Sequence, residues 1–217
     1  MISLLLVDAE LERVPDICQE DGGPQVSEGD RELRGMIVLD SYLHGHLMEG
    51  LEGARRRGRP DIVHSFLLLA QGSAACREGR LRAFVHTRAD EAIMVGPRYR
   101  PDPSYAGFLR EMEALLTEGE LGTGQEGLVL REGLSLEGLL DEISPDKVLA
   151  LSPHGERVEL RQALASSALG HVAVLIGGFP EGDYRSPVYQ LAHASVSLGE
   201  DLLTVPDVTA RVLSALP

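Results

Sequence analysis

Short apolar segments alternate with segments of helical period along the second half of the chain. The segments 148–151 and 172–176 are built from Val, Leu, Ile and Ala. Strands of a parallel sheet have this continuous apolar character because helices cover both of their faces. The alternation therefore predicts an α/β fold, with a mostly parallel sheet flanked by helices.

The same patterns locate elements along the whole chain. Apolar runs predict strands at Ile2–Val7, Met36–Leu39, Leu81–His86, Ala92–Val95, Val148–Leu151, Val172–Ile176 and Ala194–Val196. Helical periodicity predicts helices at Tyr42–Arg55, Ile62–Ala70, Tyr105–Leu116, Leu134–Ile143, Leu160–Ser167 and Val208–Leu216. Residues 118–126 are rich in Gly and Glu and are expected to form a linker or an exposed turn.

Bulk properties exclude several classes of protein. The 217 residues are enough for one large domain or two small ones. No apolar run approaches the roughly 20 residues of a membrane span, and the N-terminal residues lack the basic start of a signal peptide. Cys18 and Cys76 are too few for a thiolate zinc site and give little support for secretion. We therefore expect a cytoplasmic protein without a membrane partner.

The charge of the chain is unevenly distributed. Its formal net charge of −14 argues against general binding of polyanions, because Lys and Arg supply most of the affinity for phosphates. Arginines nevertheless cluster at 54–60 and 98–110. A locally basic surface on an acidic protein is typical of specific nucleic-acid binding. On charge alone, solvated arginines that balance nearby glutamates are the simpler interpretation.

Three glycine-containing segments follow predicted strands in the last third of the chain. They are Leu151–Gly155, Gly177–Gly182 and Val196–Val205. Glycines allow close approach to a ligand and positive φ, and ligands of α/β sheets bind beyond the carboxyl ends of strands. Taken alone, the segment IGGFPEGD is better explained as a structural turn than as a binding loop. Three in succession favour a binding edge, although none has the sequence of a triphosphate-binding loop.

Four separated motifs resemble the Nep1 (also called Emg1) family of ribosome-biogenesis proteins. They are RGRPDIVH, FVHT, IGGFPEGD and SVSLGEDLLTVPDVTARVL, and the stretch LDSYLHGHLMEGL also fits. The likeness runs from Ser3 to Leu216 and is strongest to archaeal members. The family consists of SPOUT-class methyltransferases.

This resemblance implies a fold and a function. It implies one α/β-knot domain over residues 1–217, with RNA-binding insertion elements at about 54–116 and a knotted cofactor-binding part at about 146–217. The C-terminal part would thread into a trefoil knot, and the protein would be a homodimer. S-adenosylmethionine would be the methyl donor for N1 of a pseudouridine in small-subunit ribosomal RNA. A role in assembly of the small subunit is implied as well.

The resemblance also assigns a cofactor site to the three glycine-containing segments. The residues implied are Leu151, Ser152, Gly155, Gly177, Gly178, Phe179, Gly182, Val196, Ser197, Leu198, Leu203 and Val205. Backbone groups and apolar side chains would hold the adenine. A Cβ at Gly177 or Gly178 is expected to intrude where the cofactor lies.

The arginine-rich motif supplies the RNA site implied by the resemblance. Its residues are Arg57, Arg59, Asp61, Arg98 and Arg100. Arg59 can contact phosphate or a base edge through its planar fork. Methylation of N1 removes a proton, so Asp61 is a candidate general base. A carboxylate with a pKa near 4 matches an imide-like N–H poorly, so Asp61 could equally act by orienting Arg59.

The second arginine-rich loop departs from the family pattern. Arg100 matches, but Pro103 and Gly107 stand where further arginines are expected, with Arg98 and Arg110 as neighbouring substitutes. This departure leaves open a second function, that of a non-catalytic RNA-binding assembly factor.

A third function, metal-dependent hydrolysis, would use the set Asp40, His44, His46 and His64. His44 and His46 are two residues apart and point in different directions on a helix. We expect helix capping or core hydrogen bonds from this set, and no metal.

Overall fold

The computed structural model describes residues 1–16, 35–165, 170–199 and 201–216. The strands within them are β1 Ile2–Ala9, β2 Leu81–Thr87, β3 Ala92–Val95, β4 Glu120–Leu121, β5 Leu128–Arg131, β6 Lys147–Arg157, β7 Val172–Gly177 and β8 Ala194–Ser197. The helices are α3 Ser41–His44, α4 Pro60–Gly72, α5 Ala74–Arg77, α6 Tyr105–Glu118, α7 Leu136–Ile143, α8 Leu160–Ala165, α9 Val188–Leu191 and α10 Val205–Ala215.

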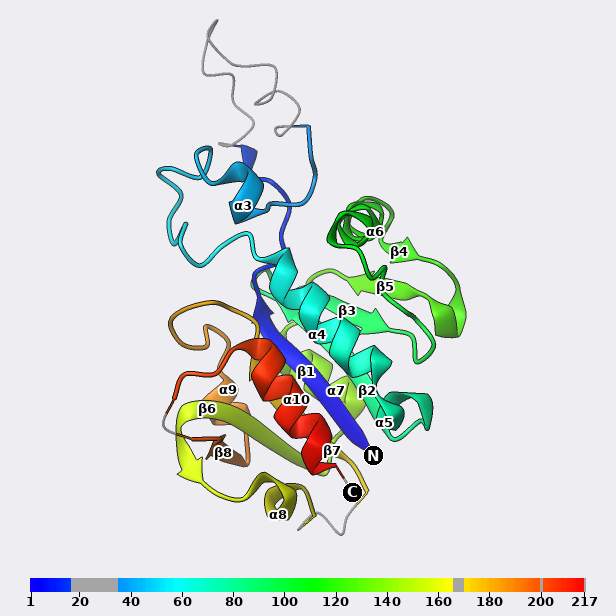
Figure 1. The fold of residues 1–217 in the computed structure, drawn as a ribbon, viewed down its shortest axis with the longest axis vertical. Coiled ribbons are helices and arrows are strands. Elements are labelled where there is room, and N and C mark those ends of the chain that lie inside the picture. The colour runs from blue at the N-terminus through cyan, green and yellow to red at the C-terminus, as the bar shows by residue number, and fades with distance from the viewer. Residues whose placement is uncertain (17–34, 166–169, 200, 217) are drawn as a thin grey trace, which may run out of the picture.

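The described strands form one sheet in the order β4-β5-β3-β2-β1-β7-β6-β8 (Figure 1). Strand β1 pairs in parallel with β2 and β7, and β6 and β8 continue the parallel half beyond β7. Strands β3, β5 and β4 extend the sheet beyond β2 by antiparallel pairing. Leu4, Leu5 and Leu6 of β1 have no exposed surface, as expected for a strand covered on both faces. The predicted α/β class is confirmed.

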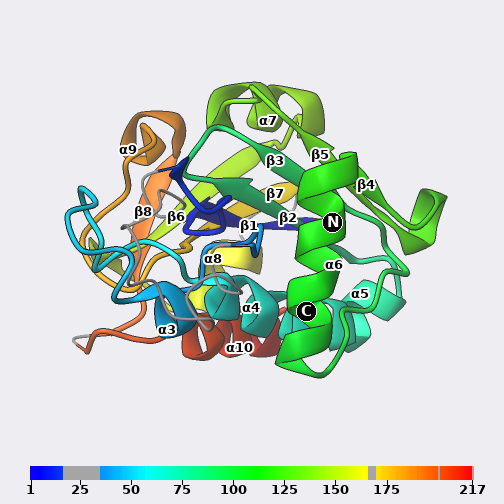
Figure 2. The same cartoon turned by 90° about the horizontal axis from the view of Figure 1, so that it is seen from above.

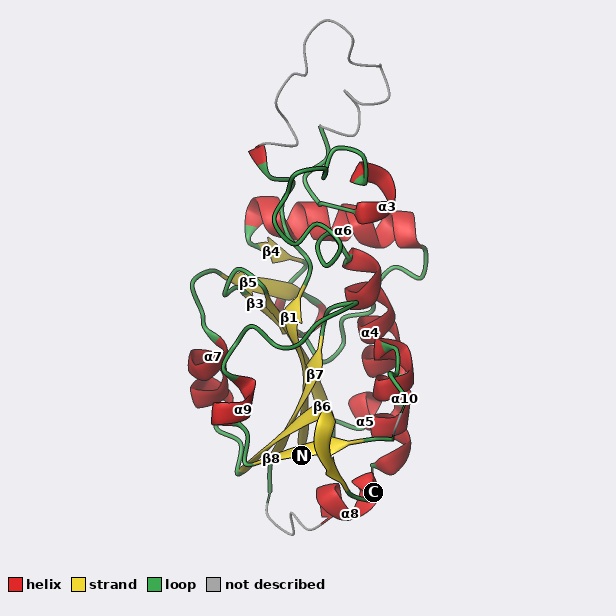
Figure 3. Ribbon diagram, turned by 90° about the vertical axis from the view of Figure 1, so that its left-hand side faces the viewer, coloured by secondary structure: helices red, strands yellow, loops and turns green. Residues whose placement is uncertain are grey.

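Helices lie on both faces of the parallel half (Figure 2). α4, α5 and α10 cover one face, and α7 and α9 cover the other (Figure 3). The larger apolar core includes Phe66 of α4 and Val212 of α10, and it extends to Phe108 of α6. The smaller core includes Leu139 of α7 and Val188 of α9. The helices cover the faces of the sheet, and the carboxyl ends of its parallel strands are followed by loops.

Helix α4 follows directly from its sequence. Pro60 occupies the first turn, where its fixed φ suits the helix and its missing N–H costs no hydrogen bond. Asp61 adds a negative charge near the positive end of the helix dipole. The side chains that face the core recur at helical spacing, namely Ile62, Val63, Phe66, Leu67 and Ala70. The RGRP sequence is therefore held at the start of a buried helix.

Two elements expected in residues 36–55 are not formed. Met36–Leu39 is not a strand, and Val38 makes only an isolated bridge with Arg13. The helix expected over Tyr42–Arg55 ends after Ser41–His44, and turns follow it. Both predictions were wrong.

The apolar period of this segment has another cause. Met48 packs with Leu39 and Val14 in a small separate core. Gly50 and Gly53 adopt φ values of 92° and 69°, which a right-handed helix cannot accommodate. The apolar residues at helical spacing in this segment therefore pack in that small core, and the backbone between them forms turns.

Other boundaries differ more modestly. The sequence does not predict β5, and residues 118–126 contain β4 and a 3₁₀ turn at Gly124–Glu126. The expected helix Leu160–Ser167 is found as α8, with its last two residues outside the described part of the chain. Within the described residues, no helix has the length and hydropathy needed to cross a membrane.

Parts of the sequence-based picture stay predictions. Cys18 lies outside the described residues, whereas Cys76 is a buried free thiol. The domain boundaries and the trefoil knot likewise remain expectations from the family resemblance.

Candidate functional site

The ends of β7, β6 and β8 bring the three glycine-containing segments together. In the ladders, Ala150 pairs with Leu175 and Leu151 pairs with Val196. The Tyr184 hydroxyl donates a hydrogen bond to the carbonyl oxygen of Leu151 at 2.7 Å. The residues predicted to bind a cofactor therefore share one edge of the sheet, at the carboxyl ends of its strands. We call this region the glycine-rich edge.

The first of the three segments is not a loop. Residues Leu151–Gly155 lie inside β6, and the register with β8 shifts between Leu151 and Glu156. A Cβ on Gly155 would lie 2.6 Å from backbone atoms of Val196. Glycine is required here because β8 passes so closely. Strand packing therefore explains a glycine that the sequence suggested was a ligand contact.

Gly177 and Gly178 are also surrounded by protein atoms. A Cβ on Gly178 would lie 2.7 Å from the Cα of Ala9, and one on Gly177 would lie 2.7 Å from the Phe179 ring. The Gly178 N–H donates to the carbonyl oxygen of Val7 at 2.7 Å. A side chain at Gly178 would thus displace β1 before it reached a ligand, which corrects the reason expected from the sequence.

A buried carboxylate holds the far end of the loop after β7. Asp8 is 1% exposed and adopts a φ of 53°, which is unusual for a residue other than glycine. Its carboxylate accepts hydrogen bonds from the Arg185 N–H at 2.6 Å and from the Ser186 hydroxyl at 2.6 Å. These bonds compensate the strained backbone of Asp8 and fix the end of the loop against β1.

The remaining residues of the predicted cofactor set lie along the glycine-rich edge from β8 to α10. Ser152 and Ser197 are buried, and Leu198 and Leu203 are half-buried. The Ser152 and Tyr189 hydroxyls are 2.9 Å apart, and the Ser197 hydroxyl donates to a backbone carbonyl two residues later. Since these hydroxyls already have partners, a ligand would meet mainly backbone groups and apolar side chains.

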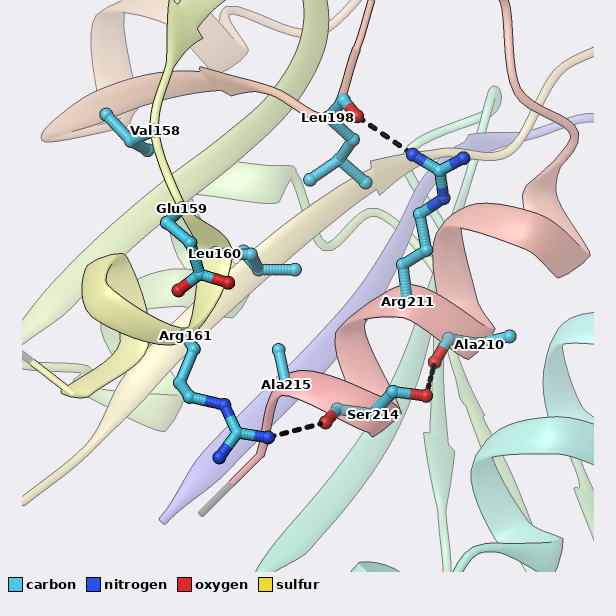
Figure 4. A pocket seen from close by; sticks show the side chains of 9 residues that line it. All are labelled: Val158, Glu159, Leu160, Arg161, Leu198, Ala210, Arg211, Ser214 and Ala215. Atoms are coloured by element: carbon cyan, nitrogen blue, oxygen red, sulfur yellow. Dashed lines mark hydrogen bonds between the residues drawn. The ribbon is translucent and has the colours of Figure 1, made fainter.

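A groove of about 490 Å³ lies beside this edge, between α10 and the start of α8 (Figure 4). Its lining residues are Val158, Glu159, Leu160, Arg161, Leu198, Ala210, Arg211, Ser214 and Ala215. The Arg211 guanidinium donates to the carbonyl oxygen of Leu198 at 2.8 Å. Leu198 alone among the lining residues belongs to the predicted cofactor set, so the groove is distinct from that set.

A buried group of charges lies at the end of β1, and we call it the β1-end cluster: Glu10, Glu12, Arg56, Arg57 and Arg88. The fully buried Glu10 accepts from Arg56 at 2.5 Å and from Arg88 at 3.0 Å. Glu12 accepts from Arg57 at 2.5 Å and lies 3.3 Å from Arg88. Burial raises the pKa of Glu10, against the opposing influence of Arg56 and Arg88.

Arg57 was predicted to bind RNA, but it belongs to the β1-end cluster. Its side chain is 15% exposed, and its Nε lies 3.1 Å from each carboxylate oxygen of Glu12. The guanidinium is therefore committed to an internal partner and does not face solvent. The sequence does carry a signal for this arrangement, since β1 ends in the acidic run VDAELE.

Arg59 and Asp61 form a bidentate pair at the start of α4. The Arg59 Nε donates to Asp61 Oδ1 at 2.8 Å, and Nη2 donates to Oδ2 at 2.7 Å. The hydrogen bond to Asp61 raises the pKa of Arg59. The two side chains are 27% and 37% exposed. Unlike Arg57, this pair is accessible to a polyanion.

Two tyrosines beside this pair were missed by sequence reasoning. Tyr42 is 87% exposed, and Asp40 caps α3 by accepting from the Tyr42 N–H at 2.7 Å. Tyr105 donates its hydroxyl proton to the other carboxylate oxygen of Asp40 at 2.5 Å, and burial raises its pKa. Both tyrosines are near enough to Arg59 to influence its pKa. The LDSYLHGH stretch was the available signal.

Arg98 and Arg100 are exposed on the loop between β3 and α6. Burial raises the pKa of the Cys76 thiol, and Arg100 is near enough to oppose this effect. Cys76 lies beyond the end of α4, whereas Asp61 lies in its first turn. Because α4 has 13 residues, its ends are about 20 Å apart. The loop then runs back along α4, because the Asp102 carbonyl oxygen lies 2.8 Å from His64 Nε2 near the start of the helix.

Gly107 explains part of the departure from the family pattern. A Cβ at this position would lie 2.1 Å from the Asp102 carboxylate. That carboxylate accepts from the Ser104 N–H at 2.8 Å and from its hydroxyl at 2.7 Å, which fixes the turn before α6. A side chain at position 107 would require the Asp102 carboxylate to move away from Ser104, while Arg110 is exposed one turn later.

Asp40, His44 and His64 of the candidate metal set have structural roles, as the sequence predicted, whereas His46 is exposed. The Asp40 N–H donates to His44 Nδ1 at 3.0 Å. His64 Nε2 lies 2.8 Å from the carbonyl oxygen of Asp102, and its ring stacks on Phe108 with centroids 4.5 Å apart. The expectation of capping and core hydrogen bonds is confirmed. In the described part of the chain, no three or more His, Cys, Asp or Glu residues are grouped to hold a metal.

Residues 4–216 match the profile of the EMG1/NEP1 methyltransferase family. The chain belongs to this family. The family resemblance seen in the sequence motifs is thereby confirmed, and the match spans both the arginine-rich motif and the glycine-rich edge.

Individual EMG1/NEP1 relatives agree along nearly their full lengths. The ribosomal RNA small subunit methyltransferase Nep1 of Methanothrix thermoacetophila is 36% identical over 216 residues, which cover 98% of this chain and 94% of the relative. Nep1 of Thermococcus kodakarensis is 39% identical over 219 residues, covering 98% and 96%.

A solved EMG1/NEP1 structure has the same fold. The crystal structure of Archaeoglobus fulgidus Nep1 bound to S-adenosylhomocysteine matches with a TM-score of 0.82 and 32% sequence identity. The match covers 98% of this chain and 95% of that one. The SPOUT assignment of the fold is confirmed by this match.

Proposed function

We propose that this protein transfers a methyl group from S-adenosylmethionine to N1 of a pseudouridine in small-subunit ribosomal RNA. The observation that carries the proposal is the likeness over 98% of the chain to a Nep1 structure with S-adenosylhomocysteine bound. The names of its relatives specify methylation of small-subunit ribosomal RNA. The choice of pseudouridine N1, and a role in subunit biogenesis in the cytoplasm, rest on the family resemblance of the motifs.

S-adenosylmethionine is the methyl donor, and the glycine-rich edge of this chain fits it. When bound, it supplies an electrophilic methyl group on a sulfonium sulfur. Leu202 is 86% exposed and Leu203 half-buried beside the ends of three strands. Apolar surface left in water at this edge favours burial against a flat organic ring. The predicted residues are thus suited to holding an adenine through backbone groups and apolar contacts.

Arg59 is the residue best placed to hold the RNA. Its guanidinium is oriented by both oxygens of Asp61, and its exposed edge remains free to approach a phosphate or a base. Arg98 and Arg100 are exposed on the loop that packs along α4 and are suited to the phosphate backbone on either side of the target. Exposed Tyr42 adds an aromatic face beside Arg59.

Asp61 has one geometric role and one proposed chemical role. Both of its oxygens accept hydrogen bonds from Arg59, so it acts first as a positioning residue. Each carboxylate oxygen retains a second lone pair, with which Asp61 can accept the proton that leaves N1. The general-base role is therefore compatible with the pairing to Arg59.

Substrate specificity gives the primary test. Purified protein is incubated with S-adenosylmethionine carrying a labelled methyl group and with two RNA hairpins that differ only in pseudouridine or uridine at one position. We expect label in the pseudouridine hairpin alone, because uridine offers a carbon–N1 glycosidic link and no free N1–H. Equal labelling of both hairpins, or labelling at another base, would overturn the assignment of N1.

Asp61→Asn separates the two roles of this residue. A general base contributes about 10²- to 10⁴-fold to the rate, so its loss would appear in kcat and in the pH profile. A positioning role predicts a higher KM for RNA with a smaller change in kcat. Asp61→Glu serves as the control, since it keeps a carboxylate but lengthens its reach.

A second candidate, a non-catalytic RNA-binding assembly factor, is favoured by the small number of accessible arginines. Arg57 is committed to Glu12, and Pro103 and Gly107 stand where the family pattern has arginines. Binding of S-adenosylmethionine and of the pseudouridine hairpin without methyl transfer would support this candidate. We further propose a homodimer, in which two subunits pool their arginines; light scattering of the purified protein tests it.

A further inference from the structure

Arg56 joins the arginine-rich segment to the loop after β7. Its Nη1 donates to the carbonyl oxygen of Asp183 at 2.6 Å and lies 3.4 Å from that of Glu181. Its guanidinium carbon lies 3.9 Å from the centre of the Phe179 ring. In both Figure 1 and Figure 2 the loop and the segment before α4 lie on the same side of the molecule. One side chain thus spans two proposed binding regions.

The inner end of Arg56 is anchored independently. Its Nε donates to the fully buried carboxylate of Glu10, and its own side chain is only 14% exposed. Glu10 is held in turn by Arg88, and its backbone carbonyl accepts from the Arg59 N–H at 2.8 Å. The residue that carries the proposed RNA contact is therefore bonded to the same anchor as Arg56.

The loop that Arg56 contacts has few other supports near its tip. Asp8 fixes residues 185–186, while Gly182 adopts a φ of 87° that favours glycine. Between Phe179 and Asp183 the backbone has no regular secondary structure. Arg55 adds a surface ion pair with Glu181 at 3.3 Å, but the Arg55 side chain is 87% exposed. Exposed pairs contribute little, so the main contacts from outside the loop are Arg56 and the Tyr189 hydroxyl, which donates to Asp183 Oδ1 at 2.7 Å.

We propose that Arg56 couples cofactor binding to RNA binding, by fastening the loop 179–183 of the glycine-rich edge to the segment that carries Arg59 and Asp61. The inference rests on the proposed function, because it needs both ligands. A ligand that orders the loop strengthens the stack of Arg56 on Phe179, which holds the Arg59 segment in its binding conformation. By linkage, RNA must then raise cofactor affinity by the same factor.

Lysine cannot replace arginine in this role. Arg56 uses one edge of a planar group for Glu10, another for the loop carbonyls, and its face for the Phe179 ring. A lysine ammonium is a point charge without a planar face or a fork. Arg56→Lys therefore keeps a positive charge for Glu10 while it removes the link to the loop.

The test measures RNA affinity with and without saturating S-adenosylhomocysteine. The probe is a fluorescent pseudouridine hairpin, and binding is followed by anisotropy. We expect the wild-type protein to bind RNA between about 5- and 150-fold more tightly in the presence of S-adenosylhomocysteine. In Arg56→Lys the factor should fall below about two-fold. Arg55→Ala, the matched control next to it, should keep the wild-type factor.

The outcomes distinguish this inference from the proposed function. If neither ligand binds the wild type, the proposed function fails and the coupling with it; if both bind but no methyl is transferred, the proposed function fails while the coupling factor still decides the inference. If both bind and methyl transfer occurs, but the coupling factor is one or survives in Arg56→Lys, the coupling alone is overturned. Should Arg56→Lys fail to fold, Phe179→Leu decides the question, since it removes the ring and leaves the Glu10 pair intact. Loss of coupling in Phe179→Leu, measured at a concentration of S-adenosylhomocysteine shown to saturate this variant, supports the inference, and retention contradicts it.

Discussion

The β1-end cluster and the Arg59–Asp61 pair come from one run of arginines, yet the chain uses them in opposite ways. Arg57 lies 15% exposed against Glu12, whereas Arg59 lies 27% exposed against Asp61. The partner of Arg57 comes from the segment just after the central strand β1, and the partner of Arg59 from the first turn of the helix that begins after it. Whether an arginine of this run stabilises the fold or faces a ligand therefore depends on which part of the chain supplies its carboxylate partner.

The largest effect expected from this comparison is on stability. Arg57→Ala leaves Glu12 buried with less compensation, and loss of one partner of a buried pair costs about 3 kcal/mol or more. We expect urea denaturation to show this loss in the free energy of unfolding. Arg59→Ala is the matched control and should cost less than about 1 kcal/mol, because its pair is partly exposed. Equal losses for the two variants would contradict the division into buried and exposed arginines.

The second expected effect is on RNA affinity, where substitution of Arg59 should have a larger effect than substitution of Arg57. Arg59→Lys keeps the charge but loses the bidentate fork, so we expect hairpin affinity to fall about 10-fold, as for loss of one good bidentate contact. Circular dichroism melting should show little change. If Arg57→Ala weakens RNA binding more than Arg59→Lys at a temperature where both are folded, the assignment of Arg59 is wrong.

A smaller effect concerns the exposed loop after β3. Arg100→Ala removes one exposed cation from the loop between β3 and α6. We expect a decrease of about one in the slope of log affinity against log salt. Discrimination between pseudouridine and uridine hairpins should not change, because phosphate contacts carry no base information. Changed discrimination would place Arg100 beside the target base.

The smallest expected effect is a pH dependence of the free energy of unfolding, and it comes from the buried His86. Burial lowers the pKa of His86 below its usual 6.5, against the opposing influence of Asp8 and Asp90. The unfolded chain then binds a proton near pH 6.5 that the folded chain does not, so this contribution to stability is lost as the pH falls below 6.5. Between pH 7 and 5.5, His86→Gln should lose stability less steeply than the wild type. Parallel curves for the two proteins would contradict it.

Local patterns were sufficient for much of the fold. Helix α4 and strands β1, β2, β3 and β7 were predicted close to their observed bounds, since each has a proline start or an uninterrupted apolar run. The expected helix over 42–55 failed because Gly50 and Gly53 take positive φ. Its apolar spacing reflects a small separate core, and periodicity alone does not reveal which surface a side chain covers.

Much less of the site could be predicted, because it depends on contacts distant in sequence. Arg57 and Glu12 are 45 residues apart, and no local pattern identifies such a pair. Gly178 was read as room for a ligand, whereas Ala9 occupies that space. Only Arg59 and Asp61, two residues apart, were paired correctly from the sequence, because their separation is short enough for local geometry to decide.

The position of β1 has a consequence for how the protein folds. Strand β1 lies between β2 and β7, with Ile2 paired to both Leu81 and Val172. Contacts so distant in sequence slow folding, because a long loop must close before they form. During synthesis the apolar β1 emerges before β7, and the two can pair only after the roughly 160 residues between them have been made. The centre of the sheet is thus completed late, and chaperones that shield exposed strands are expected to raise the yield of folded protein.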